Sequence, residues 1–317
     1  MRPRGAQDAE DARGARGAQD AQDARGAQGA EDGQIGDFGS CPRPLTVGEA
    51  LASATSELAH AGCETPRLDA ELLLSSVLGL SRERLLLDDD EEIDEAMQSA
   101  LAEAVGRRGK RREPVAYITG RKHFWDIELT VDARALLPRP ETELLVEVGL
   151  SLPPHSAVLD LGTGSGAIAL ALARARPDLE VWGSDISEQA IELARENGRR
   201  LCIDVRWLVS DLLEAVPCHI DAILCNPPYI AESERFKLPP ELGHEPERAL
   251  FAGADGLEVV RALMGQVAGR GRLRRLAIEV GEGQSRRVAE AMGGAGFGEV
   301  SVLKDLAGIE RVIDGSR

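Results

Sequence analysis

Apolar residues recur at intervals of three and four between residues 46 and 112, the spacing that places them on one face of a helix. Pro66 suits the first turn of a helix, and basic residues end the last segment, where the helix dipole favours cations. The pattern predicts a small helical domain over residues 43–112. Its helices are expected within VGEALASATSELAHAG (47–62), PRLDAELLLSSVLGL (66–80) and DEAMQSALAEAVGRRGK (94–110).

Beyond residue 112 the pattern changes to alternation. Apolar and polar residues alternate in HFWDIELTV (123–131), which is typical of a strand or a hairpin. We therefore expect residues 113–137 to form a β-hairpin linker between two larger parts of the chain.

Short apolar runs then alternate with helical stretches as far as the C-terminus. Repeated strand–helix units indicate an α/β fold with a doubly wound parallel sheet. Two final runs, 299–305 and 310–315, are expected to close the sheet as an antiparallel pair. This predicts a catalytic domain over residues 138–317. Its parallel strands are expected at 157–161, 180–185, 205–211, 221–226 and 274–281.

The N-terminal segment has a different composition. Alanine recurs at every third place of residues 5–31, with no aromatic or β-branched side chain. Such a segment buries too little apolar area to offset the entropy of ordering it, so a disordered low-complexity tail is predicted over residues 1–42. No apolar stretch follows the first arginines, and no secretory signal is expected.

Charge and composition narrow the classes of function. The formal charge of −17 and the isoelectric point near 4.8 disfavour direct binding to nucleic-acid phosphates. No apolar run approaches the roughly 20 residues that span a bilayer, so no membrane association is expected. Five cysteines without CxxC spacing predict idle thiols in a reducing cytoplasm and no metal site. We also expect a monomer.

A glycine-rich loop follows the strand expected at 157–161. Its sequence, LDLGTGSGAIAL (159–170), has Asp160 two places before Gly162 and further glycines at Gly164 and Gly166. Dinucleotide-binding loops have the spacing GxGxxG instead. The spacing DxGxGxG resembles the loop of methyltransferases that use S-adenosylmethionine, which carries no pyrophosphate. The loop is therefore expected to hold the amino-acid part of that cofactor.

Two acidic residues follow the next two strands. Asp185 ends the second strand, where a carboxylate can accept hydrogen bonds from two ribose hydroxyls; its alternative role is to cap the next helix beside Ser187. Asp211 ends the third strand and Leu212 follows it; both are expected beside the adenine, with a turn-capping role for Asp211 as the alternative.

The fourth strand ends in the corner Asn226-Pro227-Pro228-Tyr229. An amide nitrogen is a poor nucleophile because its lone pair is delocalised, so it must be held in line with the methyl group by acceptors for both N–H bonds. The side-chain oxygen of Asn226 and the carbonyl of Pro227 can be those acceptors, and Tyr229 offers a face to a planar group. The alternative for Asn-Pro-Pro alone is a rigid turn, but the glycine loop and the acid upstream favour methylation of an amino group.

At this point the chain resembles the bacterial release factor glutamine methyltransferases of the HemK/PrmC type. The resemblance rests on the Asn-Pro-Pro-Tyr corner and extends over roughly residues 45–315. It is also carried by RLDAELLL (67–74), PVAYITGRKHFWDIELTV (114–131), LLPRPETELLVE (136–147) and EPERALFAGADGLEVVR (245–261).

The resemblance implies methyl transfer from S-adenosylmethionine to the N5 amide nitrogen of the glutamine in the Gly-Gly-Gln motif of peptide chain release factors. It also implies that the helical domain helps to dock the factor. Asn226, Pro227 and Tyr229 are the expected catalytic residues, and Pro228 joins them in binding the glutamine. Residues expected to bind the cofactor are Asp160, Gly162, Thr163, Gly164, Ser165, Gly166, Asp185, Ile186, Asp211, Leu212 and Asn226.

Three alternatives remain open. One is glutamine methylation of a ribosomal protein, which shares the corner but differs at PRPETE (138–143). Another is N6-adenine methylation of nucleic acid, against which the acidic charge argues. The third is a non-catalytic adaptor, which an altered glycine loop or corner would have indicated. Leu212 departs from relatives that have an aromatic residue there. Arg139 and Glu141 are either hinge and capping residues or part of a wall of the site.

Overall fold

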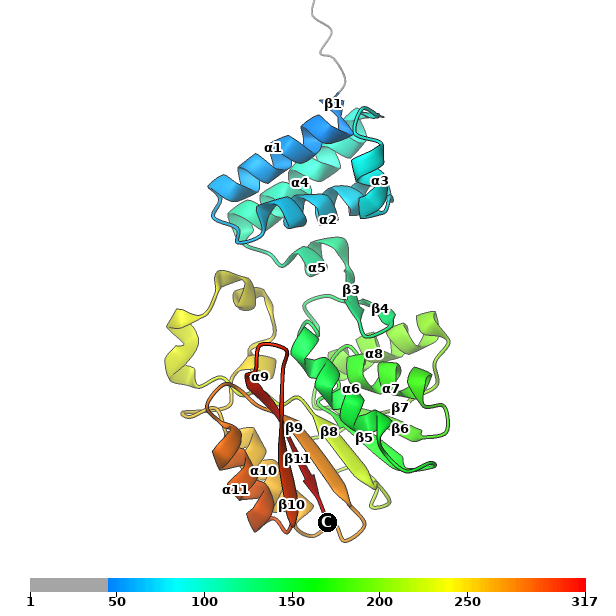
Figure 1. The fold of residues 1–317 in the computed structure, drawn as a ribbon, viewed down its shortest axis with the longest axis vertical. Coiled ribbons are helices and arrows are strands. Elements are labelled where there is room, and N and C mark those ends of the chain that lie inside the picture. The colour runs from blue at the N-terminus through cyan, green and yellow to red at the C-terminus, as the bar shows by residue number, and fades with distance from the viewer. Residues whose placement is uncertain (1–44) are drawn as a thin grey trace, which may run out of the picture. The chain divides into compact units, whose positions relative to one another are not determined.

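The computed structural model describes residues 45–317, and the tail predicted for residues 1–42 lies outside this range. The helical segment contains the three expected helices and one that was not predicted (Figure 1). A short antiparallel pair of strands joins the start of this segment, β1, to the stretch just before the last helix, β2. The elements are β1 (Leu45–Thr46), α1 (Val47–His60), α2 (Pro66–Leu78), α3 (Arg82–Leu87), β2 (Glu92–Ile93) and α4 (Glu95–Arg111).

Local signals set the bounds of these helices. At the start of α1 the hydroxyl of Thr46 accepts from the Glu49 amide at 3.3 Å, and the Glu49 carboxylate accepts from the Thr46 amide at 3.1 Å. This reciprocal pair satisfies two amides that a helix N-terminus leaves free. Pro66 occupies the first turn of α2, and Gly79 ends that helix with a φ of 66°. The helices bury a shared core that includes Leu58, Leu73, Leu74 and Leu85.

The linker contains the predicted hairpin and an additional short helix. Strands β3 (Arg121–Phe124) and β4 (Ile127–Thr130) pair as antiparallel neighbours around the turn at Trp125. Helix α5 (Val115–Thr119) precedes them. Helix α5 was not predicted, because a five-residue helix bounded by Pro114 and Gly120 is too short to show helical periodicity.

The predicted sheet is confirmed, including its antiparallel end. Seven strands lie in the order β10-β11-β9-β8-β5-β6-β7; the five from β9 to β7 are parallel, and β11 runs antiparallel to both neighbours. The strands are β5 (Ala157–Leu161), β6 (Glu180–Asp185), β7 (Arg206–Val209), β8 (Ala222–Cys225), β9 (Arg275–Glu279), β10 (Glu299–Lys304) and β11 (Glu310–Ser316).

Helices cover both faces of the sheet, as a doubly wound fold requires (Figure 1). On one face lie α6 (Glu143–Leu150), α7 (Ala167–Ala175) and α8 (Glu188–Leu201); on the other lie α10 (Glu258–Val267) and α11 (Ser285–Gly294). Side chains on the central strands alternate between the two cores: Val158 packs with the first group, and Leu159 with the second. Burial on both faces explains the nearly continuous apolar runs of β5 and β8.

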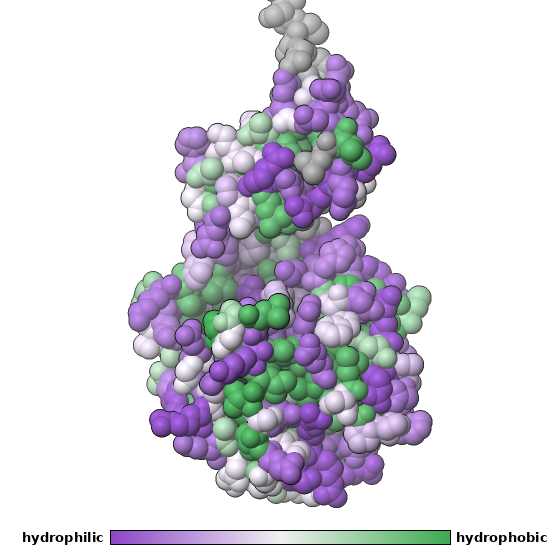
Figure 2. Space-filling view, viewed as in Figure 1, coloured by the Kyte–Doolittle hydropathy of each residue, from purple (hydrophilic) through white to green (hydrophobic). Residues whose placement is uncertain are grey.

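Short elements complete the chain around the carboxyl ends of the parallel strands. They are η1 (Pro140–Thr142), η2 (Glu232–Lys237), η3 (Pro240–His244) and α9 (Glu247–Leu250). At one lateral edge of the sheet, strand β10 exposes the side chains of Val300 and Val302. Figure 2 shows apolar side chains on this face of the molecule. Among residues 45–317, no helix has the length and apolar character needed to cross a membrane.

A buried cluster of charges joins the helices to η3. The Arg108 guanidinium on α4 lies 2.6 Å from the Asp69 carboxylate on α2 and 2.7 Å from the Glu241 carboxylate on η3. Arg112 reaches the same Glu241 oxygen at 2.6 Å. Arg108 and Asp69 are only 7% and 5% exposed, so removal of either partner would leave an uncompensated charge away from water.

We expect Arg108→Ala to lower the free energy of unfolding by about 3–5 kcal/mol, because it leaves Asp69 buried and unpaired. The control is Arg84→Ala, which removes the exposed ion pair between Arg84 and Asp88 and should cost no more than about 1 kcal/mol. Urea denaturation followed by circular dichroism measures both. Equal, small losses in the two variants would contradict the assignment of Arg108 as a buried anchor.

Candidate active site

The glycine-rich loop stands directly after β5, as predicted. Gly162, Gly164 and Gly166 have φ values of 74°, 55° and 85°, the left-handed region that side chains rarely adopt. A Cβ on Gly166 would lie 3.0 Å from the Trp207 ring, so this glycine also permits close packing of the loop against β7. The backbone of the loop is therefore bare where it faces the carboxyl ends of the strands.

Asp160 is buried under this loop, only 1% exposed. Its Oδ2 accepts hydrogen bonds from the Thr163 hydroxyl at 2.5 Å and from the Ala169 amide at 3.0 Å, while no described residue bonds its Oδ1. Desolvation raises the pKa of this carboxyl to about 7. Asp160 thus anchors the loop to the start of α7, and neither it nor Gly166 lines the cavity described next.

A cavity of about 1100 Å³ opens at the carboxyl ends of β5, β6 and β8. Its size is in the range of pockets that bury a small-molecule ligand, and it lies where ligands of open α/β sheets bind. The structure brings most of the predicted site residues to its walls: Gly162, Thr163, Gly164, Ser165, Asp185, Ile186, Asp211, Leu212, Asn226, Pro227 and Pro228.

Asp185 lies at the end of β6 with its carboxylate between the loop and α8. Oδ2 accepts from the Gly164 amide at 3.0 Å, and Oδ1 accepts from the Ser187 amide at 2.8 Å. Burial raises the pKa of Asp185 above its usual value, which these amides partly oppose. The N-cap of α8 is Ser187, whose hydroxyl accepts from the Ala190 amide at 3.3 Å. Since a carboxylate has about four acceptor positions, Asp185 can accept further hydrogen bonds from a ligand in the cavity.

Asp211 and Leu212 form the wall after β7. Leu212 has a φ of 45°, an uncommon conformation for a residue with a Cβ, and its carbonyl accepts from the Ser210 hydroxyl at 3.0 Å. Ile186, on the adjacent wall, is 53% exposed. An apolar side chain left uncovered at the rim of a cavity suits a flat, apolar group of a ligand.

The Asn-Pro-Pro-Tyr corner begins directly after β8. The Asn226 side-chain Nδ2 donates to the Thr142 hydroxyl at 3.1 Å, and its Oδ1 is buried without a hydrogen-bond partner among the described residues. A buried acceptor that is left unpaired costs about 1–3 kcal/mol, so such an atom is a candidate for binding a donor from a ligand.

A second cavity, of about 1690 Å³, lies on the other side of the corner. Tyr229 lines it together with Arg139 and Glu141, and residues of α2 and α5 are among those that form its other walls. The Tyr229 carbonyl accepts from the Gln284 amide at 2.9 Å, and its ring packs at the position where Gly281 has no side chain. Burial raises the pKa of the Tyr229 phenol to about 12. Asn226 to Pro228 line the first cavity, so the corner separates the two.

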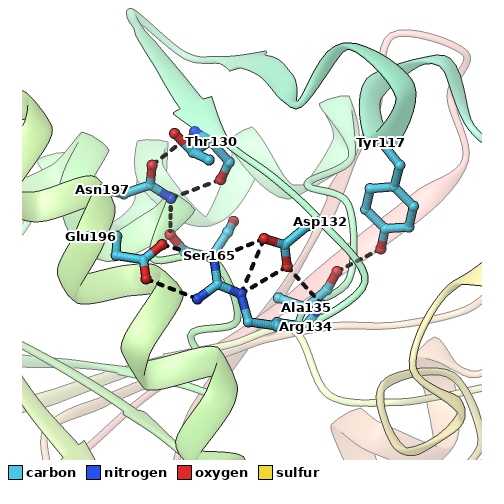
Figure 3. Close-up of polar contacts among 8 residues, drawn as sticks. All are labelled: Tyr117, Thr130, Asp132, Arg134, Ala135, Ser165, Glu196 and Asn197. Carbon is cyan, nitrogen blue, oxygen red and sulfur yellow. Dashed lines mark hydrogen bonds and ion pairs between the residues drawn. The ribbon is translucent and has the colours of Figure 1, made fainter.

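The segment after β4 forms a wall of the first cavity, and Figure 3 shows how it is held. The Asn197 amide on α8 exchanges hydrogen bonds with the backbone of Thr130 at 2.8 and 2.9 Å and donates to the Ser165 carbonyl at 3.0 Å. Arg134 pairs with Asp132 and Glu196, each at 2.8 Å. Asn197 therefore fixes the glycine loop and the wall relative to each other.

Arg139 and Glu141 both line the second cavity, which favours the interpretation of this segment as a wall of the site. The Arg139 guanidinium lies 2.5 Å from the Glu245 carboxylate, which also accepts from the Leu137 amide at 3.0 Å. Glu245 is 5% exposed, so this contact ties the wall to the loop after η3.

Sequence reasoning did not identify Thr142, Asn197, Glu245 or Glu279 as part of the site. Glu279 ends β9 at the same edge as Asn226, and its carboxylate accepts from the Thr142 hydroxyl at 2.7 Å. For Glu279 the sequence did contain a signal, namely a polar residue that ends an apolar run at the carboxyl edge of a parallel sheet. Within residues 45–317, no group of three or more His, Cys, Asp or Glu side chains is placed to hold a metal ion.

Comparisons with known proteins identify related domains in this chain. A family model described as the PrmC N-terminal domain matches residues 49–120, and one described as the methyltransferase small domain matches residues 140–261. The hMettl16 catalytic domain has a similar fold, with a TM-score of 0.50 and 15% identity over 70% of this chain and 82% of that one.

Curated relatives are similar over most of their length. The release factor glutamine methyltransferase of Deinococcus radiodurans is 38% identical over 276 residues, which cover 85% of this chain and 98% of that protein. The protein of the same name from Rhodospirillum rubrum is 41% identical over 280 residues, covering 85% and 84%. With this identity over this coverage, the chain belongs to the family of release factor glutamine methyltransferases.

Proposed function

We propose that this enzyme transfers a methyl group from S-adenosylmethionine to the N5 amide nitrogen of the glutamine in the Gly-Gly-Gln motif of peptide chain release factors. The observation that carries the proposal is the buried, unpaired Oδ1 of Asn226 at the corner between two cavities. One cavity suits a small cofactor, and the other is large enough to admit a loop of a protein substrate. The names of the curated relatives support this choice of substrate.

The residues around the first cavity fit S-adenosylmethionine. When bound, it supplies a reactive methyl group on a positively charged sulfur. The bare backbone of Gly162 to Ser165 would hold its amino-acid part, and the free acceptor positions of Asp185 would bind the ribose hydroxyls. Asp211, Leu212 and Ile186 would surround the adenine. Leu212 supplies apolar contact in place of an aromatic ring.

The corner would hold the glutamine amide. Asn226 Oδ1 and the Pro227 carbonyl accept its two N–H bonds, which directs the nitrogen lone pair toward the first cavity. Pro227 and Pro228 fix the backbone that carries this carbonyl. Tyr229 packs against the planar amide from the second cavity. Positioning of this kind contributes up to roughly 7–11 kcal/mol in the best intramolecular analogues. The nitrogen that gains the methyl group would become acidic and would release one of its protons to water, so no general base is required.

The parts of the chain would have different roles. We propose that residues 43–112 form the helical domain that binds the release factor, residues 113–137 the linker, and residues 138–317 the catalytic domain. Walls of the second cavity come from α2 and α5 as well as from the corner, which supports contact of one substrate with both parts. The enzyme would act as a cytoplasmic monomer without direct contact to nucleic acid.

The test is a mass spectrum of a purified release factor after incubation with the enzyme and S-adenosylmethionine. We expect the Gly-Gly-Gln peptide to gain the mass of one methylene, and a factor with alanine in place of that glutamine to gain nothing. Gain on a ribosomal protein or on DNA instead would contradict the substrate assignment while leaving methyl transfer in place. Absence of transfer to any of these substrates would favour a non-catalytic adaptor.

Asn226→Ala should lower the transfer rate by roughly 10²-fold or more, since it removes an acceptor that positions the nucleophile. Affinity for S-adenosylmethionine, measured by isothermal titration, should stay close to that of the wild type, because the predicted role of Asn226 is mainly toward the substrate. A large loss of cofactor affinity would overturn that assignment.

Asp185→Ala should have the opposite profile. The loss of hydrogen bonds to a charged group is expected to weaken cofactor binding by at least about tenfold. Asp178→Ala is the matched control, because Asp178 lies just before β6, pairs with Arg176 and does not line the cavity. Unchanged affinity in Asp185→Ala, or an equal loss in the control, would exclude Asp185 as the ribose ligand.

A further inference from the structure

We propose that Thr142 and Glu279 are positioning residues that fix the Asn226 amide in one of its two orientations, with its oxygen turned toward the substrate. This inference rests on the proposed function, because it explains why Asn226 presents its oxygen, and not its nitrogen, to the glutamine amide. Neither residue belongs to the glycine loop, to the predicted cofactor ligands Asp185 and Asp211, or to the Asn-Pro-Pro-Tyr corner.

Three separate segments bring these side chains together. Thr142 ends η1, Asn226 follows β8 and Glu279 ends β9. Strands β8 and β9 are parallel neighbours in which Cys225 pairs with Ile278, so Asn226 and Glu279 occupy the next position of each strand. Thr142 and Glu279 are 3% and 2% exposed, which excludes water as a competing partner for most of their polar atoms.

The two hydrogen bonds that link Glu279, Thr142 and Asn226 can run in only one direction when Glu279 is ionised. A carboxylate accepts and cannot donate, so the single hydroxyl proton of Thr142 goes to Glu279 Oε2, at 2.7 Å. The Thr142 oxygen then has only lone pairs to offer. Its partner at 3.1 Å must be a donor, which is the Nδ2 of Asn226. The amide oxygen of Asn226 is thereby turned away from Thr142.

This direction matters because the two ends of an amide have nearly the same shape. A flipped Asn226 would present N–H groups to the N–H groups of a glutamine amide, so these donors would face each other without an acceptor. With Thr142 and Glu279 in place, Oδ1 is the atom left buried and unpaired, as the structure has it. The network therefore sets which end of Asn226 the substrate meets.

Thr142→Val tests the direction of the network, since it removes the hydroxyl while keeping the shape of the side chain. The loss of one hydrogen bond worth about 1 kcal/mol predicts a fall in kcat of roughly fivefold at saturating cofactor, measured on protein shown to be folded by circular dichroism. Thr142→Ser, which keeps the hydroxyl, should restore kcat to near the wild-type value. An unchanged kcat in Thr142→Val, or equal losses in both variants, would overturn the proposal.

Hydrogen exchange of the Asn226 side-chain amide tests the network without methyl transfer, so its outcome does not depend on the proposed function. In ¹⁵N-labelled protein, the side-chain amide signals of Asn226 are identified by their absence in Asn226→Ala. They should be protected from hydrogen exchange in the wild type and Thr142→Ser, and exchange faster in Thr142→Val. Equal exchange in all three would contradict the network. Lack of transfer to release factors by the wild type would refute the function alone.

The pH dependence of kcat gives a second test. Burial raises the pKa of Glu279 to about 7; the Thr142 hydroxyl lowers it, Glu141 raises it, and Arg311 and Arg139 lower it. Protonated Glu279 can donate to Thr142, which removes the fixed direction. The kcat should therefore rise with pH through about 7, with the ionised form active.

Glu279→Gln should abolish this rise, because its side chain does not titrate. Tyr229 and Cys225 also face Glu279, but burial holds the pKa of both above the range in which the rise is expected. Burial also raises the pKa of Asp160 to about 7, and Glu279 is not among the groups that shift it. A rise that persists in Glu279→Gln would overturn the role of Glu279.

Discussion

Parallel strands that end at one edge of the sheet place polar side chains where neither a strand nor a helix can satisfy them. Asp160 is the last residue but one of its strand, Asp185 and Glu279 end theirs, and Asn226 follows directly after its own. A buried polar atom without a partner is costly, so each of these groups must find a hydrogen bond or await one from a ligand. This requirement organises the whole site, from the anchored glycine loop to the corner.

The four residues meet the requirement in different ways. Asp160 is satisfied on one oxygen by the loop that it anchors, and Asp185 is held by two amides with acceptor positions to spare. Glu279 accepts the hydroxyl proton of Thr142, and the Thr142 oxygen in turn accepts from the Asn226 side-chain nitrogen. Only Asn226 retains a buried oxygen that faces no donor while it borders the cofactor cavity. The site is thus prepared for a ligand with N–H groups before the ligand arrives.

Local signals in the sequence predicted most of the fold. The glycine loop, the corner and the strand–helix alternation are each contained in a short stretch, and the seven-stranded sheet followed from them. Helix α5 was missed, because five residues carry no helical period. The partners of Asn226 were also missed: Thr142 is 84 residues from Asn226 and 137 from Glu279 in the chain, and no local pattern links residues so far apart.

The most direct measurement follows the substrate nitrogen itself. A release factor with ¹⁵N in its glutamine side chains is treated with the enzyme and S-adenosylmethionine, and its side-chain amide signals are recorded by NMR. We expect the paired NH₂ signals of the Gly-Gly-Gln glutamine to be replaced by a single N–H signal, because one proton has given way to a methyl group. An intact NH₂ pair in a factor that has gained a methyl group elsewhere would contradict the central claim.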